Sequence, residues 1–341
     1  MISFASDYTT GMHPRILEAY AATNLEPLPG YGMDAYSSRA AEKIRLAIQK
    51  PEAEVFFLTG GTQTNETVIS TMLEPWQGVI AATTGHIQVH EAGAVEYTGH
   101  KVLCLPSHAG LLDPKEVEAY IKTFYQDESH DHMVFPGMIY ISYPTEMGTL
   151  YPKETLAQLY DLCRKYDMKL FIDGARLGYG LASLEADMTM AELASLCDVF
   201  YIGGTKVGAP IGEAVVFSGS PAPRHFITMI KQHGAMLAKG RMTGIPFDVL
   251  FTDGLYMEIS QHAIQMAERL KEIFRTKGYA FAWKSPTNQQ FVILPNEKLE
   301  TLRKEVDFSV WEPADETHSV VRFATSWSTT KENLDLLEQL L

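Results

Sequence analysis

The chain has 341 residues, of which 46% are hydrophobic and 21% charged, and its formal net charge at pH 7 is −14. This composition is typical of a folded globular protein and excludes a disordered or low-complexity chain. The length predicts about two domains. The acidic balance, without any basic run, argues against nucleic acid or an anionic membrane as a partner. A small anionic ligand is compatible with it, because a helix N-terminus can bind an anion locally.

Signals for membrane insertion or export are not found in the sequence. No stretch reaches about 18 consecutive apolar residues, and the opening MISFASDYTTG has neither a basic region nor an apolar core. The spacing of Cys104, Cys163 and Cys197 fits neither a metal site nor a disulfide framework. We therefore expect a cytoplasmic protein in which the three cysteines are small core residues.

Apolar runs alternate with amphipathic runs through most of the chain, and this order predicts a mainly parallel sheet with helices on both faces. The apolar runs are continuous, as is typical of strands buried on both sides. The predicted strands are 54–59, 78–82, 101–105, 137–142, 169–174, 198–204 and 212–217, and the predicted helices are 64–73, 113–125 and 153–166.

The pattern changes near Pro246. A long helical stretch from Asp248 to Lys277 is followed by short runs of mixed type, which predict a smaller α+β domain. We therefore expect a large domain at 1–247, whose N-terminal segment contributes to the ligand site, and a small domain at 248–341. In the small domain the predicted strands are 290–294 and 320–324, and the predicted helices are 299–304 and 331–340.

Three unusual loops directly follow predicted strands: GGTQTN at 60–65, DGAR at 173–176 and GGTK at 203–206. Ligands of open parallel sheets bind at the carboxyl ends of the strands, so we expect these loops to cluster at one edge. The first loop opens a helix, and its glycines allow backbone N–H groups to approach an anion. It matches neither a P-loop nor a G-x-G-x-x-G motif, so a phosphate monoester is the simplest guest. Taken alone, it fits a tight turn before a capped helix equally well.

The other two loops place charged groups at buried strand ends. Asp173 is either a helix cap or a buried carboxylate that needs a cation, such as a protonated ring nitrogen. Arg176 offers a bidentate fork for a carboxylate or phosphate. Lys206 is either a surface lysine or an amine nucleophile for an aldehyde, with glycines beside it that let a flat ring approach the backbone. Pyridoxal 5′-phosphate carries an aldehyde, a phosphate and a basic ring nitrogen, and would use all three loops.

These motifs make the chain similar to the low-specificity L-threonine aldolases, within the β-eliminating lyase group of fold-type-I pyridoxal phosphate enzymes. The resemblance covers residues 1–250 well and the rest loosely. It implies a mainly parallel sheet flanked by helices, with a smaller C-terminal α+β domain. The matching segments are Ser6-Asp7, Tyr31-Gly32, Gly61–Asn65, His86 with Glu91–Gly93, Asp173–Arg176, Lys206–Gly212 and Arg322.

The resemblance implies that seven residues bind the cofactor: Gly61, Thr62, His86, Asp173, Arg176, Lys206 and Arg241. Lys206 would bond covalently to it, Asp173 would keep its ring nitrogen protonated, and His86 would stack on its ring. Gly61 and Thr62 would bind its phosphate. Lys206, His86 and Asp173 would therefore be the catalytic residues, and no metal is implied.

The resemblance assigns other residues to the substrate and to subunit contacts. Ser6, Arg176 and Arg322 would bind the substrate carboxylate, and Arg176 would also lie at the cofactor. Arg241 would reach the phosphate of a neighbouring subunit, which implies a homo-oligomer, a dimer of dimers, with shared active sites. The implied reaction cleaves a β-hydroxy-α-amino acid of the threonine or allo-threonine type to glycine and an aldehyde.

The substrate end departs from the family pattern. The family carries an N-T-H-N-like stretch where residues 143–147 read Tyr-Pro-Thr-Glu-Met, so Glu146 replaces a histidine expected at the substrate hydroxyl. The general base therefore has three candidates: His86, a water bound by Glu91, and Glu146. His86 and His90 are four residues apart, but Glu91 is not placed as in the zinc motif H-E-x-x-H.

Three other functions stay open at this point. β-Elimination from another amino acid, including an aromatic one, or racemisation would use the same cofactor and the same lysine. A non-catalytic cofactor-binding protein would not need the full set of Lys206, Asp173 and both carboxylate-binding arginines. A nicotinamide-dependent oxidoreductase is disfavoured, because the dinucleotide-binding motif is missing.

Overall fold

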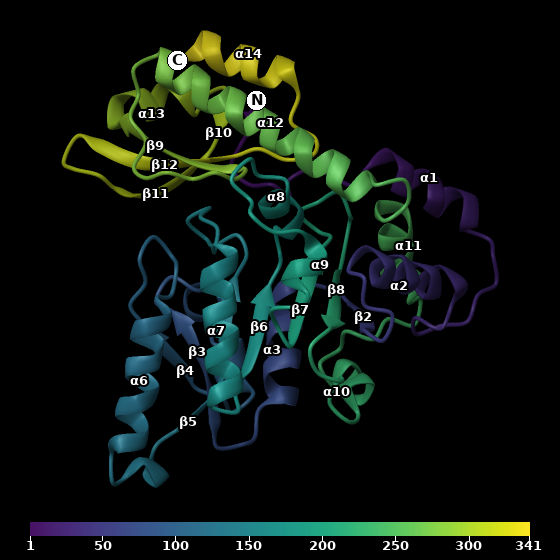
Figure 1. Ribbon diagram of the computed structural model, residues 1–341. Helices are drawn as coiled ribbons and strands as arrows, with labels where there is room; N and C mark the ends of the chain where they lie inside the picture. The colour runs from purple at the N-terminus through teal and green to yellow at the C-terminus, as the bar shows by residue number, and fades with distance from the viewer.

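A seven-stranded sheet forms the centre of the computed structural model, which describes all 341 residues (Figure 1). The strand order is β2-β8-β7-β6-β5-β3-β4. Only β8 runs antiparallel to its neighbours, so the prediction of a mainly parallel sheet is confirmed. The strands are β2 (Glu54–Leu58), β3 (Gln77–Ala82), β4 (Val102–Leu105), β5 (Phe135–Ser142), β6 (Lys169–Asp173), β7 (Val199–Gly203) and β8 (Glu213–Phe217).

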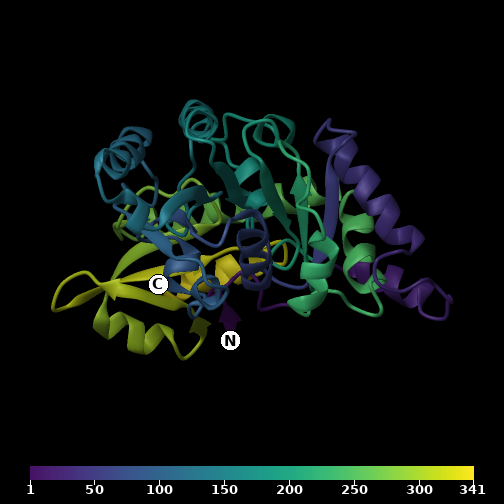
Figure 2. The same cartoon turned by 90° about the horizontal axis from the view of Figure 1, so that it is seen from below.

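Helices cover both faces of this sheet, which explains why its strands are continuous apolar runs. In β5, Ile139 and Ile141 belong to one buried cluster, whereas Met138 and Tyr140 belong to the cluster on the opposite face. Figures 1 and 2 show α6 and α7 over one face and α3 over the other. The first face is covered by α2 (Ala35–Ala47), α6 (Pro114–Gln126), α7 (Lys153–Lys165), α8 (Leu177–Leu181) and α9 (Met190–Leu193), and the second by α3 (Gly61–Met72), α4 (His86–Val89), α5 (Ala94–Tyr97) and α10 (Phe226–Gln232).

The C-terminal part forms a second layer built on an antiparallel sheet of order β11-β12-β9. A third hydrophobic cluster fills this part. The first residues of the chain belong to it as well, because β1 (Ile2–Ser3) pairs with β10 (Val306–Asp307) and Phe4 is buried in the same cluster. Figure 2 shows the N-terminus beside the C-terminal part. Its other elements are β9 (Gln289–Pro295), β11 (Ser309–Pro313), β12 (His318–Ala324), α13 (Asn296–Leu302) and α14 (Lys331–Leu340).

The long helix predicted from Asp248 to Lys277 is wrong as a single element. The chain instead forms α11 (Arg241–Leu250) and α12 (Leu255–Thr276). Asp253 and Gly254 between them have φ of 52° and 73°, and left-handed residues cannot continue a right-handed helix. α11 packs against α2 and against α1 (Pro14–Thr23), two helices that the sequence analysis did not predict.

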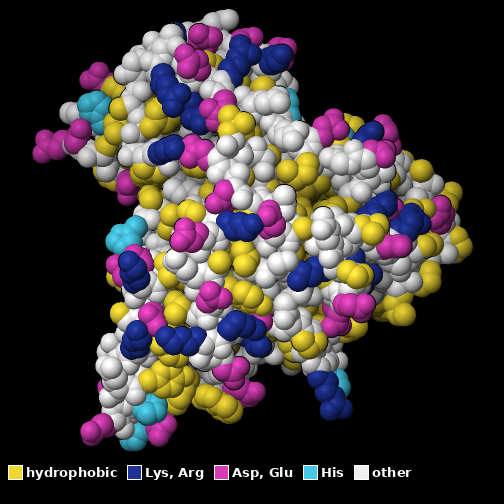
Figure 3. Space-filling model, in the orientation of Figure 1, with side chains coloured by type: hydrophobic (Ala, Val, Ile, Leu, Met, Phe, Trp, Pro, Cys, Tyr) yellow, Lys and Arg dark blue, Asp and Glu magenta, His cyan; other side chains and the backbone are white.

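The surface and the cysteines fit the composition. Basic and acidic side chains are interspersed over the face seen in Figure 3. Cys163 and Cys197 are buried and Cys104 is partly buried, and all three are free thiols. No helix is both long and apolar enough to cross a membrane.

Candidate active site

A cavity of about 350 Å³ opens at the carboxyl ends of β2, β6 and β7. All three loops singled out in the sequence contribute to its wall, so the expectation that they cluster at one edge of the sheet is confirmed. Of the predicted site residues, the wall contains Gly61, Thr62, His86, Asp173, Arg176 and Lys206, and it also contains Ser142, Glu146, Tyr201 and Glu213.

The position of Asp173 follows from the alternation of side chains along β6. Asp173 lies two residues after Phe171, so both project from the same face of the sheet. Tyr140 on β5 and Tyr201 on β7 belong to the same buried cluster as Phe171. The two tyrosines therefore flank the carboxylate from the neighbouring strands, and each hydroxyl donates to it at 2.5 Å.

The Asp173 carboxylate is the most heavily hydrogen-bonded group in the cavity. Besides the two tyrosines, Asn65 Nδ2 donates to it at 3.1 Å and the Ala175 amide at 3.0 Å. Burial raises the pKa of this carboxyl, but His86 and the two tyrosines lower it by more than burial raises it. The net pKa is therefore below the ordinary value. Asp173 is therefore a buried anion, which suits a cationic ring nitrogen.

Lys206 follows β7 in the cavity wall, half-buried, and the Tyr179 hydroxyl donates to its carbonyl at 2.6 Å. Burial and the nearby Arg176 lower the pKa of its amine, which makes the neutral, nucleophilic form more accessible. The glycines before it serve a different purpose from the one expected. A Cβ at Gly203 would lie 2.2 Å from the Ala175 carbonyl oxygen, so its missing side chain allows close packing of protein backbone rather than of a ligand ring.

His86 belongs to a hydrogen-bonded chain that starts at Asp173. Asn65 Nδ2 donates to Asp173 and to Glu91 Oε1, and Glu91 Oε1 lies 2.6 Å from His86 Nδ1. Burial lowers the His86 pKa, but Glu91 and Asp173 raise it more, so the net pKa is above the ordinary value. The ring of His90 lies 5.7 Å from that of His86, and no cluster of three or more His, Cys, Asp or Glu side chains could hold a metal ion.

Glu146 lies in the turn after β5 and lines the cavity beside His86. Its Oε1 accepts hydrogen bonds from Ser142 Oγ at 2.6 Å and from the His86 amide at 3.0 Å. Burial raises the pKa of this carboxyl.

Arg176 forms a bidentate ion pair with Asp7, at 2.6 and 3.0 Å. Arg322 donates to the Ala5 carbonyl at 2.9 Å, which places it beside the N-terminal segment. Its Nε and the Ser6 hydroxyl are buried without any partner. Unpaired buried donors are costly, so this corner fits an anionic group such as the carboxylate predicted from the resemblance.

The loop predicted to bind phosphate forms the N-terminus of α3. Gly60 precedes the helix without a side-chain cap, and the first-turn amides at Gly61 and Thr62 have no intrahelical acceptor. Arg241, by contrast, lies outside the cavity wall of its own chain. Its guanidinium donates to the carbonyl groups of Thr23, Asn24 and Glu26, at the end of α1.

The sequence analysis did not anticipate Glu213. This glutamate is 4% exposed, begins β8 opposite Gly203, and accepts a hydrogen bond from the Gly204 amide at 3.1 Å. Burial raises the pKa of its carboxyl. The only signal in the sequence is an acidic residue at the start of the apolar run GEAVVF.

The residues of this cavity fit pyridoxal 5′-phosphate. Uncapped helix amides are available for its phosphate, an amine with a lowered pKa for its aldehyde and a buried carboxylate for its ring nitrogen. The unpartnered buried oxygens Asn65 Oδ1 and Glu91 Oε2 lie in the same network as that carboxylate.

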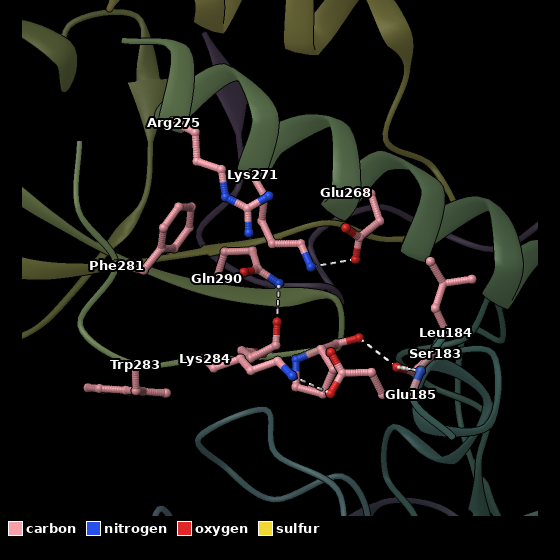
Figure 4. Close-up of a pocket in the computed structure, with 12 residues that line it drawn as sticks. Ser183, Leu184, Glu185, Glu268, Lys271, Arg275, Phe281, Trp283, Lys284 and Gln290 are labelled. Carbon is pink, nitrogen blue, oxygen red and sulfur yellow. Dashed lines mark hydrogen bonds and ion pairs between the residues drawn. The ribbon is translucent and has the colours of Figure 1, made fainter. Parts of the chain in front are cut away.

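A second cavity, of about 420 Å³, lies between α12 and the segment before β9 (Figure 4). Its charged groups mostly pair with one another. Lys271 contacts Glu268, and Lys284 Nζ lies 2.7 Å from Glu185. Gln290 Nε2 donates to backbone carbonyls. Because these side chains already have partners, the second cavity lacks the combination found in the first: a nucleophilic amine, a buried carboxylate and uncapped helix amides.

Comparison with known proteins agrees with the geometry of the first cavity. The model of the beta-eliminating lyase family matches residues 3–297. A low specificity L-threonine aldolase of Pseudomonas sp. is 30% identical over 305 residues, which are 88% of this chain and 86% of that protein. A structure of Leishmania major threonine aldolase is 41% identical with a TM-score of 0.94, and the match covers 100% of this chain and 98% of that one.

More distant structures share the fold alone. A variant of Thermus thermophilus aspartate aminotransferase has a TM-score of 0.70 at 16% identity, over 100% of this chain and 90% of that one. The expected fold class, a fold-type-I architecture with a smaller C-terminal part, is therefore confirmed.

Proposed function

We propose, because the chain belongs to the beta-eliminating lyase family, that it is a pyridoxal phosphate-dependent lyase that cleaves a β-hydroxy-α-amino acid of the threonine type to glycine and an aldehyde. The observation that carries this proposal is the meeting of Lys206, Asp173 and the N-terminus of α3 in one cavity. The Pseudomonas and Leishmania relatives are named as threonine aldolases, which supports the substrate class.

Each cavity residue then has a task. Lys206 would hold the cofactor covalently, the amides of Gly61 and Thr62 would bind its phosphate, and His86 would contact its ring. Asp173 would keep the ring nitrogen protonated, and the bound cofactor would supply an electron sink for the bond that breaks. The four hydrogen bonds to Asp173 are already formed, so its charge needs little reorganisation during the reaction.

The substrate carboxylate is bound at the corner formed by Ser6, Arg176 and Arg322. The unpaired Ser6 hydroxyl and Arg322 Nε support this assignment. The fork of Arg176 is shared with Asp7, so Arg176 offers the substrate its charge and its remaining N–H groups. Holding the carboxylate fixes which bond of the α-carbon is aligned with the ring, and this alignment selects carbon–carbon cleavage over the alternatives.

The protein is further proposed to act in the cytoplasm as a homo-oligomer, a dimer of dimers with shared sites. Its three free cysteines suit a reducing compartment. In such an assembly Arg241, which lies outside the cavity of its own chain, would reach the phosphate of a neighbouring subunit.

Replacement of Lys206 by alanine tests the proposal. Wild-type protein with pyridoxal phosphate should show visible absorbance, and borohydride should attach the cofactor to the peptide that contains Lys206. The Lys206→Ala variant should lose this attachment and its turnover. Normal turnover by this variant would show that the assignment of the lysine is incorrect.

A further inference from the structure

Glu146 is a cavity carboxyl to which the proposed function gives no role. Both of its hydrogen bonds, from Ser142 Oγ and from the His86 amide, end on Oε1. Oε2 therefore remains available to a ligand. Two donors from separate elements fix the plane of the carboxyl group, so Oε2 has a defined direction in the cavity wall.

Three carboxyl groups line the cavity: Asp173, Glu146 and Glu213. Glu213 lies beside Lys206 and accepts from the Gly204 amide, so the comparison that matters for the substrate is between Asp173 and Glu146. Asp173 accepts four hydrogen bonds and its pKa is lowered, whereas Glu146 accepts two and burial raises its pKa. Two neighbouring titratable groups with opposite shifts are typical of sites where one stays charged and the other exchanges protons. Asp173 suits the permanent charge, and Glu146 suits proton transfer.

The two competing candidates for the general base are less suitable. Glu91 does not line the cavity, its Oε1 is occupied by Asn65 and His86, and its unpartnered Oε2 is buried. His86 lines the cavity, but its Nδ1 is bound to Glu91. Its ring is also the group proposed to lie against the cofactor, so it already has another task.

We propose that Glu146 is the general base that takes the proton from the hydroxyl group on the β-carbon of the substrate. This inference rests on the proposed function and names the residue that starts its bond cleavage. Oε2 accepts the hydroxyl proton, and the oxygen–hydrogen electron pair becomes the second bond of the aldehyde carbonyl. The Cα–Cβ electron pair stays with the α-carbon fragment, where the bound cofactor would delocalise it. A proton added to the α-carbon completes glycine, so the net change moves one proton from oxygen to carbon.

The C-terminal part of the chain positions the turn that carries Glu146. Trp283, on the wall of the second cavity in Figure 4, donates from Nε1 to the Met147 carbonyl at 2.9 Å. Thr287 Oγ1 donates to the Gly148 carbonyl at 3.0 Å. These contacts hold the backbone that follows Glu146, whereas Ser142 precedes it in the sequence. A general base needs such support, because its oxygen has to be held at a fixed position relative to the substrate.

The test replaces Glu146 by glutamine, with Glu52→Gln, at an exposed position, as the matched control. Cleavage of L-threonine and L-allo-threonine by Glu146→Gln should be slower by about 10²–10⁴-fold. The change in cofactor absorbance on adding glycine, which has no hydroxyl group, should remain. Glu52→Gln should behave as wild type in both assays.

The pH profile adds a readout that a structural role would not change. Activity of the wild type should rise with pH as Glu146 ionises, over a range above that of an ordinary carboxyl, because its pKa is raised. The charged groups that face it are His86, Asp173 and Arg176, which both proteins retain. This rise should be absent in Glu146→Gln and partly restored in Glu146→Asp.

Three results would count against the inference. Cleavage by Glu146→Gln within about threefold of wild type, far from the loss of a general base, would exclude the base role. Loss of the glycine response would show that Glu146 acts on the structure of the site instead. A wild-type protein that binds the cofactor but cleaves no β-hydroxy amino acid would overturn the proposed function itself, and the inference with it.

Discussion

Asp173 and Lys206 line one cavity, and their surroundings hold the pKa of each below its ordinary value. His86 and the hydroxyls of Tyr140 and Tyr201 lower the pKa of Asp173 despite its burial. Burial and Arg176 lower the pKa of the Lys206 amine. A strong electrophile needs the first property and a covalent attachment needs the second. At the scale of single residues, the site therefore depends on groups whose pKa values the protein has shifted.

Replacing Asp173 by asparagine should remove the charge while keeping the shape. The variant should still attach the cofactor through Lys206, because that bond does not involve Asp173. Its turnover should fall by more than about 10²-fold, since the ring nitrogen loses its anionic partner. Visible absorbance and steady-state kinetics measure the two effects, and turnover within tenfold of wild type would contradict the assigned role.

Sequence motifs could locate the charged residues of the site but not their partners. Asp173 and Lys206 each follow a buried apolar run directly, so a strand-end position could be predicted for both. Tyr140 and Tyr201 read as ordinary core residues, because their contact with Asp173 depends on the lateral register of three strands. Glu213 was not predicted as a site residue for the same reason, because its burial depends on its pairing with Gly203 between the antiparallel strands β7 and β8.

The turn at residues 143–149 shows how one element positions another. Gly148 has φ +73°, and a Cβ there would lie 2.2 Å from Ser285 Oγ. The turn therefore needs glycine both for its backbone conformation and for its contact with the C-terminal part. Its neighbour Glu146 depends on this turn for its position in the cavity.

Substitution of Gly148 by alanine should lower both stability and activity. The strained conformation alone costs about 1–3 kcal/mol in the free energy of unfolding, and the clash with Ser285 adds to it. Gly254→Ala is the control, because Gly254 has the same φ of +73° but no atom within 4 Å of its Cβ. Thermal unfolding should rank wild type above Gly254→Ala and that above Gly148→Ala, and only Gly148→Ala should lose activity. Equal effects of the two substitutions would contradict this account.

Elements with a strong periodic pattern were predictable, and those defined by backbone conformation were not. The seven strands of the large sheet were found within a few residues, because burial on both faces leaves an unbroken apolar run. The break between α11 and α12 was missed, because the helical period of apolar residues continues across it. Asp253-Gly254 was the available signal, since both residue types tolerate the left-handed region.

At the scale of the whole molecule, the site joins both ends of the chain. Asp7 lies shortly after β1 and pairs with Arg176 beside the large sheet. It also accepts a hydrogen bond at 2.9 Å from Nδ2 of Asn288, which belongs to the C-terminal part. The corner proposed to bind the substrate carboxylate therefore forms only when both parts of the chain are assembled. The sequence could indicate a large and a small part of the chain. It could not indicate how they meet at Asp7, because that contact joins residues 281 positions apart.

Shared active sites would make two inactive variants complement each other. A site in the proposed oligomer takes Lys206 from one subunit and Arg241 from its neighbour. Co-expression of Lys206→Ala with Arg241→Ala should therefore produce mixed oligomers in which some sites have both residues intact. Activity per milligram should exceed that of either variant alone at limiting cofactor. Activity no higher than the sum of the separate variants would argue against sharing through Arg241.

The most direct test of the account is the pair of products. Purified protein with pyridoxal phosphate would be mixed with L-threonine, then with L-allo-threonine, and both glycine and acetaldehyde would be measured. We predict equal amounts of the two products, with the ratio of rates giving the stereochemical preference. A cofactor spectrum that responds to amino acids without any release of acetaldehyde would contradict the proposed carbon–carbon cleavage and point to a different reaction at the same lysine.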